Sequence, residues 1–322
     1  MGEVREDGSR ARPGSPEDKV TGMDVSRRGF IGGAAAFAAA SRLLRADGGE
    51  DDIARWERET RLVTPQLYAQ YMGDGDTRGL AALEKLEAAF DKVVREARDT
   101  VVTGDVPAIW SLYNMGYVVK TRESLFSIDL VHRRDAEFAS MLDFALITHN
   151  HGDHWRQGFY NSLNRSGKTV VSNFLDNFGV KNWIRDGGYV RGVKTFRIGD
   201  VEIRTSLIDH NDYLIDYTTA FEIKTGGFLL YHTGDSGKGT EPKLGTVWGR
   251  PDLWLLFPGC GIDTAKAVSR VCAKRIVFGH AWELSHRHSS RLDERLIRPR
   301  LDAARSAGCG DVSLAFWGDR II

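Results

Sequence analysis

The stretch Phe144-Ala145-Leu146-Ile147-Thr148-His149-Asn150-His151-Gly152-Asp153-His154 decides the fold. Residues 144–147 are apolar, as in a buried strand. The six positions 149–154 hold three imidazoles and one carboxylate, in a chain that has only 9 His. This density indicates a metal site rather than a polar loop with incidental histidines.

The spacing of these residues suits two cations. Alternate side chains of an extended segment point the same way, so His149 and His151 can converge on one cation. Gly152 then allows a sharp turn, which re-aims Asp153 and His154 toward a second cation. The separation in two-metal sites is roughly 3.5–4 Å. The stretch therefore predicts a binuclear centre.

Residues 148–154 match the motif T-H-x-H-x-D-H, and from Pro107 to the C-terminus the chain resembles the metallo-β-lactamase superfamily. Gly158 departs from the pattern, because many members place this glycine one residue earlier. The resemblance implies an α/β fold, a four-layer αββα sandwich of two β-sheets flanked by helices. It also implies that the metals lie at one edge of the sheets.

The resemblance further implies three more ligands in a fixed order, each after an expected strand. The candidates are His210, Asp235 in a Thr-Gly-Asp turn, and His280. Asp235 resembles the carboxylate that bridges both metals in binuclear members. The implied set is His149, His151, His210 and Asp235 for one metal, and Asp153, His154, Asp235 and His280 for the other. Asp153 and His280 are also the expected catalytic residues.

Three other polar residues are expected behind the ligands or at the edge of the substrate site. His232 is an alternative ligand to His210, but it leaves an apolar strand, which favours a supporting position. Glu283 and His286 are expected to hydrogen-bond a ligand imidazole and fix its tautomer, with an exposed helix start as the alternative.

Four further residues are expected to be supporting or surface residues. Asp129 and Asp209 are candidates for the same supporting role as Glu283. His132 and His288 are interpreted as surface histidines.

The predicted site suits hydrolysis. Two cations that share a bridging oxygen lower the pKa of water, so a hydroxide nucleophile exists without a serine or cysteine. Asp153 is placed to orient that hydroxide and take its proton. We therefore expect a binuclear metal-dependent hydrolase that cleaves an ester, lactone or phosphodiester bond of a small molecule. Zn²⁺ is the expected metal, and Mn²⁺ or Fe²⁺ suits the same ligands.

The Thr-Gly-Asp turn bears on the substrate, and two alternatives to a hydrolase stay open. The Thr-Gly-Asp turn resembles the lactonase and phosphodiesterase branch, whereas common zinc β-lactamases carry Cys or Ser where Asp235 stands, so antibiotic hydrolysis is not expected. The persulfide dioxygenases of the same superfamily use one iron held by two histidines and an aspartate, and are the alternative function. A binding protein without catalysis is the third interpretation.

Composition argues against some partners. Lys+Arg 44 against Asp+Glu 44 gives a formal net charge of zero, so no global field recruits nucleic acid or an anionic membrane. The 3 Cys residues lack C-x-x-C spacing, so neither a disulfide framework nor a thiolate zinc site is indicated. The oligomeric state is left open.

The chain divides into three expected parts: a disordered leader with an export signal at 1–46, a helical extension at 47–104, and the metallo-β-lactamase-fold domain at 105–322. Residues 51–100 read as two helices separated at 73–76. Later helices are expected at 264–272 and 291–307. Strands are expected at 118–120, 126–130, 144–147, 169–172, 201–207, 218–223, 228–231, 253–257, 275–278 and 312–316.

The segment Ser26-Arg27-Arg28-Gly29-Phe30-Ile31 precedes a weakly apolar run at 32–40. The run is too short and too rich in Ala and Gly for a stable membrane span. Together the two segments resemble a twin-arginine export signal, with an Ala-rich helix after two arginines as the alternative. We expect the twin-arginine export machinery as a partner, and a periplasmic or secreted location.

Replacing both motif arginines, Arg27→Lys with Arg28→Lys, should leave the protein in the cytoplasm, folded and metal-loaded. The export machinery would read these residues, and no core contact is expected of them. Cell fractionation with immunoblotting measures the distribution. The pair Arg42→Lys and Arg45→Lys, outside the motif, serves as the control and should export normally. Unchanged periplasmic recovery of the motif variant would end the assignment.

Overall fold

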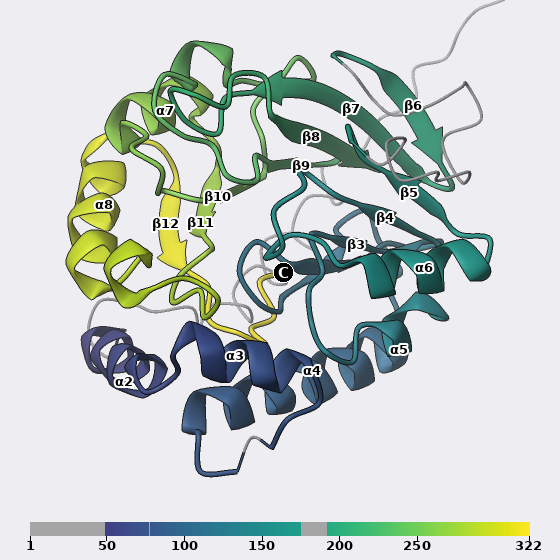
Figure 1. The fold of residues 1–322 in the computed structure, drawn as a ribbon. Helices are drawn as coiled ribbons and strands as arrows, with labels where there is room; N and C mark the ends of the chain where they lie inside the picture. The colour runs from purple at the N-terminus through teal and green to yellow at the C-terminus, as the bar shows by residue number, and fades with distance from the viewer. Residues whose placement is uncertain (1–48, 77, 175–191) are drawn as a thin grey trace, which may run out of the picture. The chain divides into compact units, whose positions relative to one another are not determined.

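The computed structural model describes residues 49–76, 78–174 and 192–322 (Figure 1). The leader and export signal expected at 1–46 lie outside the described residues. Two β-sheets face each other and carry helices on their outer sides. This mixed α/β arrangement confirms the predicted fold class. None of the helices in the described ranges is long and apolar enough to cross a membrane.

The first sheet has five strands within the described ranges, in the order β1-β2-β3-β4-β5. These are β1 (Ala108–Ser111), β2 (Tyr117–Lys120), β3 (Leu125–Ile128), β4 (Phe144–Leu146) and β5 (Thr169–Val171). β1, β2 and β3 pair antiparallel, whereas β3, β4 and β5 run parallel. All of β4 is buried, as expected of a parallel strand covered on both faces.

The second sheet has seven strands in the described part of the chain, in the order β12-β11-β10-β9-β8-β7-β6. β6 to β9 form antiparallel neighbours, and β9 to β12 run parallel. The carboxyl ends of β9, β10 and β11 therefore meet at one edge. The strands are β6 (Thr195–Ile198), β7 (Val201–Ile208), β8 (Thr218–Thr225), β9 (Phe228–His232), β10 (Leu253–Leu256), β11 (Arg275–Phe278) and β12 (Asp311–Leu314).

Helices cover both outer faces (Figure 1). On the first sheet, α4 (Ala81–Asp99) packs against β2, and α6 (Gln157–Arg165) packs against β5 and the short α5 (Ala136–Ala139). On the second sheet, α8 (Glu294–Ser306) packs against β12 and α7 (Thr264–Val271). Two short 3-10 helices complete the set, η2 (Glu241–Lys243) and η3 (His288–Ser290).

Helix α4 shows how the pattern of apolar residues produces the packing. Leu83, Leu86, Phe90, Val93 and Ala97 follow spacings of three and four, and all five are fully buried. This spacing places them on one side of the helix, which faces the core. Ala82 and Ala89 are buried beside this stripe, and the charged residues of α4 lie on the other side.

The N-terminal helical segment has one more break than the sequence predicted. The expected break at 73–76 lies between α3 (Pro65–Met72) and α4, but α2 (Gly49–Arg61) also ends before α3. Thr64 caps α3, because its side chain accepts a hydrogen bond from the Leu67 amide at 3.3 Å. Pro65 suits the first helical position, where no amide donor is needed. The prediction of two helices was therefore incomplete.

Strands β1 and β6 and helix α6 were not predicted, and β1 shows why. Its edge is completed by the end of the chain: the Ile321 amide donates to the Ile109 carbonyl at 2.7 Å, and the Ile109 amide donates to Ile322 O at 3.2 Å. This pairing joins residues that are far apart in the sequence, so no local pattern predicts it.

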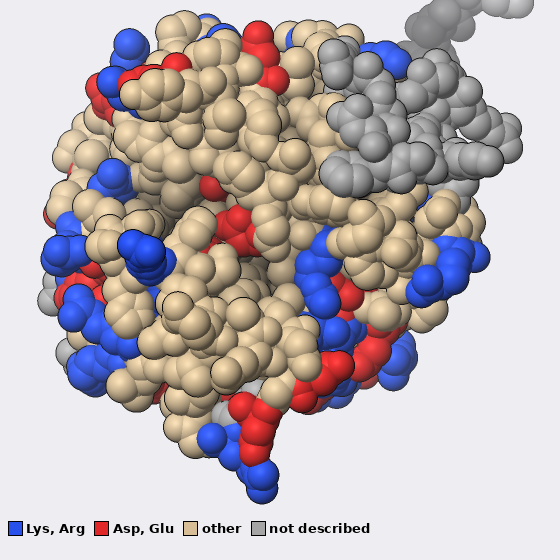
Figure 2. All heavy atoms as spheres, in the orientation of Figure 1, with Lys and Arg blue, Asp and Glu red and all other residues tan. Residues whose placement is uncertain are grey.

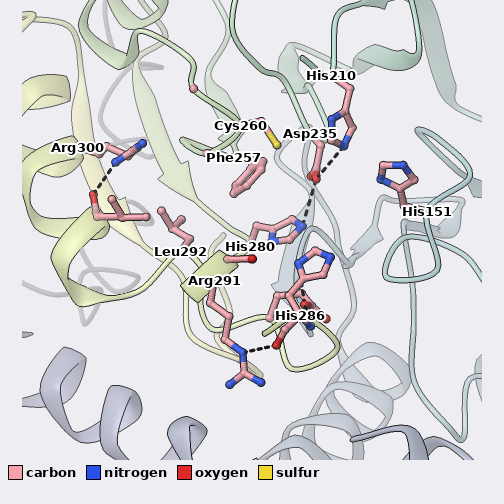
Figure 3. A pocket seen from close by; sticks show the side chains of 15 residues that line it. His151, His210, Asp235, Phe257, Cys260, His280, His286, Arg291, Leu292 and Arg300 are labelled. Carbon is pink, nitrogen blue, oxygen red and sulfur yellow. Dashed lines mark hydrogen bonds and ion pairs between the residues drawn. The ribbon is translucent and has the colours of Figure 1, made fainter. Parts of the chain in front are cut away.

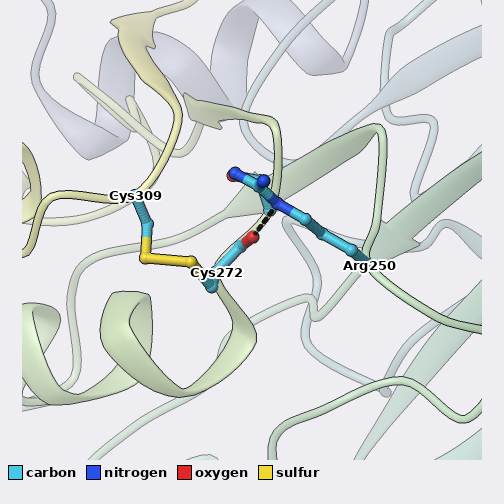
Figure 4. The surroundings of a disulfide bond; sticks show 4 residues. Arg250, Cys272 and Cys309 are labelled. Atoms are coloured by element: carbon cyan, nitrogen blue, oxygen red, sulfur yellow. Dashed lines mark hydrogen bonds between the residues drawn. A yellow bond between two sulfur atoms is a disulfide. The ribbon is translucent and has the colours of Figure 1, made fainter.

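The structure corrects the prediction about cysteines. Cys272 and Cys309 form a disulfide with a Cα–Cα distance of 5.0 Å (Figure 4). Cys272 ends α7 and Cys309 precedes β12, and the Arg250 Nε donates to the Cys272 carbonyl at 2.6 Å. Cys260 is free, and burial raises the pKa of its thiol to about 12. The pairing depends on tertiary structure, which residue spacing cannot reveal.

Replacing the pair, Cys272→Ser with Cys309→Ser, should lower the free energy of unfolding by about 2–4 kcal/mol, because the disulfide restricts the unfolded chain. Urea unfolding followed by circular dichroism, without reductant, measures this difference. Reductant should bring the wild type down to the stability of the double variant, and Cys260→Ser should keep its sensitivity to reductant. A double variant as stable as the oxidised wild type would contradict the assignment.

Candidate metal centre

The predicted ligands lie in loops at the carboxyl ends of strands: His149, His151, Asp153 and His154 after β4, His210 after β7, Asp235 after β9, and His280 after β11. The packing of the two sheets brings these loops together. Figure 2 shows a hollow on this face with acidic side chains inside it. Only His151 among the predicted ligands is more than slightly exposed.

One cluster consists of His149, His151 and His210. A potential ligand atom from each lies within 4.8 Å of the other two. The ring centroids of His149 and His151 are 4.6 Å apart, and those of His151 and His210 are 4.7 Å apart. The imidazoles therefore converge as the sequence predicted for the first cation.

A second cluster consists of Asp153, His154 and His280, again with potential ligand atoms within 4.8 Å of one another. The Asp153 Oδ2 lies 3.1 Å from His280 Nε2 and 3.6 Å from His154 Nε2. The turn at Gly152 thus separates these side chains from the first cluster. Asn114 steadies this carboxylate, because its Nδ2 donates to Asp153 Oδ2 at 2.9 Å.

Asp235 lies between the two clusters. Its Oδ1 is 3.2 Å from His154 Nε2, and its Oδ2 is 3.3 Å from His280 Nε2 and 3.5 Å from His210 Nε2. Its oxygens therefore approach imidazoles of both clusters, which is the position required of a bridging carboxylate.

Several of these atoms lack hydrogen-bond partners although they are buried. In the described part of the chain, none is found for His149 Nε2, His154 Nε2, His210 Nε2, His280 Nε2 or Asp235 Oδ1. A buried polar atom without a partner costs about 1–3 kcal/mol. Imidazole and carboxylate atoms that point at one another without hydrogen bonds suit divalent cations, which accept their lone pairs. The residues therefore fit a metal centre.

A buried carboxylate sets the orientation of two imidazoles. Asp129 Oδ2 accepts from His154 Nδ1 at 2.8 Å and from the Thr148 hydroxyl at 2.6 Å. Since the Thr148 hydroxyl donates to Asp129, its oxygen is free to accept from His149 Nδ1 at 2.9 Å. Both imidazoles then carry hydrogen on Nδ1 and direct the Nε2 lone pair into the centre.

The neutral imidazoles of the first cluster follow from burial. Burial lowers the pKa of His149 well below its ordinary value and also lowers the pKa of His151. Both rings therefore keep an unprotonated nitrogen near neutral pH, as a metal ligand requires.

The second cluster attracts positive charge. Burial opposes ionisation of Asp153 and Asp235, but His154 and His280 outweigh it and hold the pKa of both carboxyls below the usual range. Burial also lowers the pKa of His280, but Asp235 and Asp153 outweigh it and raise that pKa to about 10. The two carboxylates thus favour a cation at this point, whether a proton or a metal ion.

His232 and Asp209 lie behind the candidate ligands and bond to the segments that carry them. His232 is fully buried and accepts from the Gly234 amide at 3.1 Å through Nδ1, so its Nε2 donates to the Met115 carbonyl at 3.1 Å. Both ring nitrogens are occupied, and His232 is therefore no alternative ligand. Asp209 accepts from the Asp216 amide and pairs with Lys243, so it organises the loop that carries His210.

Glu283 supports His286 rather than a ligand imidazole. The buried Glu283 carboxylate lies 3.0 Å from His286 Nδ1 and accepts from the Ser285 and His286 amides at 2.6 Å each. The Tyr113 hydroxyl also donates to Glu283 at 2.9 Å. His286 is 48% exposed and lines the pocket.

The interpretation of His132 as a surface residue was wrong. Its ring is fully buried, stacks on Phe90 with centroids 4.1 Å apart, and lies 2.7 Å from the Tyr71 hydroxyl. Burial lowers its pKa to about 3, so it is a neutral core histidine. His288 is exposed, as expected.

A pocket of about 380 Å³ opens beside the candidate ligands (Figure 3). No motif in the sequence marks Phe257, Leu292 or Arg300, which line this pocket from loops and from α8. It is lined by His151, His210, Asp235, Phe257, Gly259, Cys260, Gly261, His280, Glu283, His286, Ser290, Arg291, Leu292, Leu296 and Arg300. Its volume suits a small molecule.

The sandwich of two sheets, with a histidine and carboxylate cluster at the sheet edge, is the metallo-β-lactamase fold that the sequence predicted. Igni18, a metallo hydrolase from Ignicoccus hospitalis, superposes with a TM-score of 0.51 at 18% identity, covering 67% of this chain and 97% of that one. CmlA, a diiron β-hydroxylase from Streptomyces venezuelae, gives a TM-score of 0.50 at 15% identity, covering 67% and 53%. These likenesses concern the fold.

Two curated relatives are similar in sequence, both named UPF0173 metal-dependent hydrolase. The one from Caldivirga maquilingensis is 29% identical over 152 residues, which is 44% of this chain and 65% of the relative. The one from Heliobacterium modesticaldum is 28% identical over 126 residues, 35% of this chain and 52% of the relative. The matched region thus spans less than two thirds of either relative. No protein-family model matches the sequence.

The variant Asp129→Asn should weaken metal binding about 10–100-fold, the usual effect of losing a partner of a ligand imidazole. Asparagine tolerates the positive φ of 46° at this position, so the backbone should be kept. Competition with a fluorescent zinc chelator measures the affinity. Asp252→Asn is the matched control, since Asp252 accepts from the Leu229 amide and pairs with Lys274 at the strand ends opposite the ligand loops, and should change affinity less than about threefold. Equal effects of the two variants would contradict the role of Asp129.

Proposed function

We propose that this protein is a hydrolase that depends on two divalent cations and cleaves an ester, lactone or phosphodiester bond of a small molecule. The position of Asp235 carries the proposal, because its oxygens lie 3.2–3.5 Å from imidazoles of both clusters. The two relatives named metal-dependent hydrolases support the reaction class. The bond type rests on the resemblance of the Thr-Gly-Asp turn to the lactonase and phosphodiesterase branch.

We assign the ligands to the two cations in the way that the resemblance to the superfamily implies. One cation takes His149, His151, His210 and Asp235, and the other takes Asp153, His154, Asp235 and His280. Imidazole and carboxylate ligands suit Zn²⁺, and they also suit Mn²⁺ and Fe²⁺. When bound, such cations polarise the bond to be cleaved and lower the pKa of water.

The chain itself supplies proton transfer and orientation. We assign Asp153 as the group that accepts the proton of the attacking water, because Asn114 holds this carboxylate beside the second cluster. His280 stacks on Phe257 with centroids 4.2 Å apart, and its Nε2 faces the carboxylates of Asp153 and Asp235. Its ring is thereby fixed for contact with the reacting group.

A second candidate function is oxidation by iron. The similarity in fold to a diiron β-hydroxylase supports this second candidate, since histidine and carboxylate ligands bind iron as well as zinc. A persulfide dioxygenase-like activity with one iron is the form that the sequence suggested. Both oxidative activities consume oxygen, whereas hydrolysis does not.

We also propose export through the twin-arginine route to the periplasm or beyond. The Cys272–Cys309 disulfide supports it, because disulfides persist mainly in oxidising compartments. The route carries folded proteins, so the cations can bind before export.

The variant Asp235→Ala should reduce hydrolysis at least 100-fold and lower the bound metal from two ions per chain, because the two cations lose their shared carboxylate. Elemental analysis and turnover of a panel of 4-nitrophenyl esters, lactones and bis(4-nitrophenyl) phosphate measure both effects. Asp212→Ala is the control, since Asp212 is 47% exposed and pairs with Lys238. It should behave as wild type.

The same preparation separates hydrolysis from oxidation. Chelation should abolish turnover, zinc or manganese should restore it, and an oxygen electrode should record no consumption. One iron per chain, with oxygen consumed and full activity in Asp235→Ala, would disprove the binuclear hydrolase.

A further inference from the structure

The pocket beside the candidate metal centre has two chemically different ends. Asp235, His280 and Glu283 line one end. Helix α8 and the loop before it supply the other, with Leu292, Leu296 and Arg300. Figure 3 shows Arg300 across the pocket from His151, with Phe257 and Leu292 between them. A molecule that fills the pocket therefore meets the candidate metal ligands at one end and a guanidinium at the other.

Two arginines line the pocket, but one of them is already occupied. The buried Arg291 donates to the carbonyls of Thr60, Val63 and Leu284 at 2.8, 2.8 and 3.0 Å. Its Nε donates to the His286 carbonyl at 3.0 Å. These bonds tie the loop after β11 to the N-terminal helices. Arg291 is therefore a structural residue, with few donors left for a ligand.

Arg300 has far fewer partners. Its Nη1 donates to the Leu296 carbonyl at 3.3 Å, one turn earlier in α8. Its Nε is buried without a hydrogen-bond partner, and no carboxylate lies within ion-pair distance of its guanidinium, in the portion of the chain that the structure describes. The residue is half-buried, and burial lowers its pKa without a described carboxylate to compensate. A half-buried guanidinium with donors to spare can take an anion from outside the chain.

We propose that Arg300 binds an anionic group of the substrate, a carboxylate or a phosphate, at the end of the pocket away from the metal ligands. The proposal rests on the proposed hydrolase function and names its substrate class. Guanidinium binds both anions through paired hydrogen bonds. Phe257 and Leu292 line the middle of the pocket, so an apolar spacer joins the anion to the bond that is cleaved.

The charges also set the direction in which the substrate binds. The guanidinium of Arg300 attracts an anion to its own end of the pocket, away from the candidate metal ligands. The cleavable bond is then left beside the metal ligands. Arg300 is thus a specificity-determining residue rather than a catalytic one.

Two esters of equal length test this role. Mono-4-nitrophenyl glutarate carries a terminal carboxylate, and 4-nitrophenyl pentanoate carries a methyl group instead. In the zinc-loaded protein, Arg300→Gln should lower kcat/KM for the glutarate ester about 10–100-fold, the worth of a charged hydrogen bond, and change the pentanoate ester less than about threefold. Arg300→Lys should recover part of the loss. Arg305→Gln, an exposed arginine of the same helix, is the matched control.

A binding measurement decides the proposal independently of turnover. Butanoate and butyl phosphate are titrated calorimetrically into zinc-loaded wild type and Arg300→Gln. At least one of them should bind the wild type and lose at least tenfold in affinity in the variant, and the stronger of the two identifies carboxylate or phosphate. If neither ester is cleaved but this loss is seen, the hydrolase proposal fails for these esters and the anion site stands. Equal binding by both proteins, or none by the wild type, overturns the proposal.

Discussion

The candidate centre depends on the buried carboxylate of Asp129. It lies at the end of β3, is completely shielded from solvent, and accepts from the Thr148 amide and hydroxyl and from His154 Nδ1. A buried carboxylate must have its oxygens satisfied, so these bonds hold its partners firmly. They fix both ends of the stretch from 148 to 154, and therefore the relative directions of the histidines within it. The remaining candidate ligands follow other strands and lie against a segment whose histidines are already oriented.

The sequence revealed the parts of the site that depend on local spacing. The density of ligands at 149–154 indicated a metal site, and the resemblance to the metallo-β-lactamase superfamily added His210, Asp235 and His280. The structure brings the seven side chains close to one another. Asn114 could not be found in this way, because it reaches Asp153 from a loop between β1 and β2. The same holds for the disulfide and the β1 edge, whose partners are distant in sequence.

The histidines that do not belong to the centre show a second limit of sequence reasoning. His132 and His232 are both fully buried, yet one stacks in the core and the other bonds to backbone groups near the centre. Residue type and polarity cannot separate these roles, because burial and tautomer depend on what the fold places around each ring. The relevant neighbours, Phe90 and Met115, come from other elements.

The contacts of Arg291 bear on the order in which the molecule forms. Its guanidinium bonds to Thr60, which is 231 residues earlier in the chain. The edge of β1 likewise pairs with a distant residue, because the Ile321 amide donates to the Ile109 carbonyl. Native contacts between such distant residues make folding slow, because much chain entropy is lost before they form. The loop after β11 therefore takes its shape only when the N-terminal helices are in place, and the short stretch that identifies the fold cannot by itself assemble the pocket.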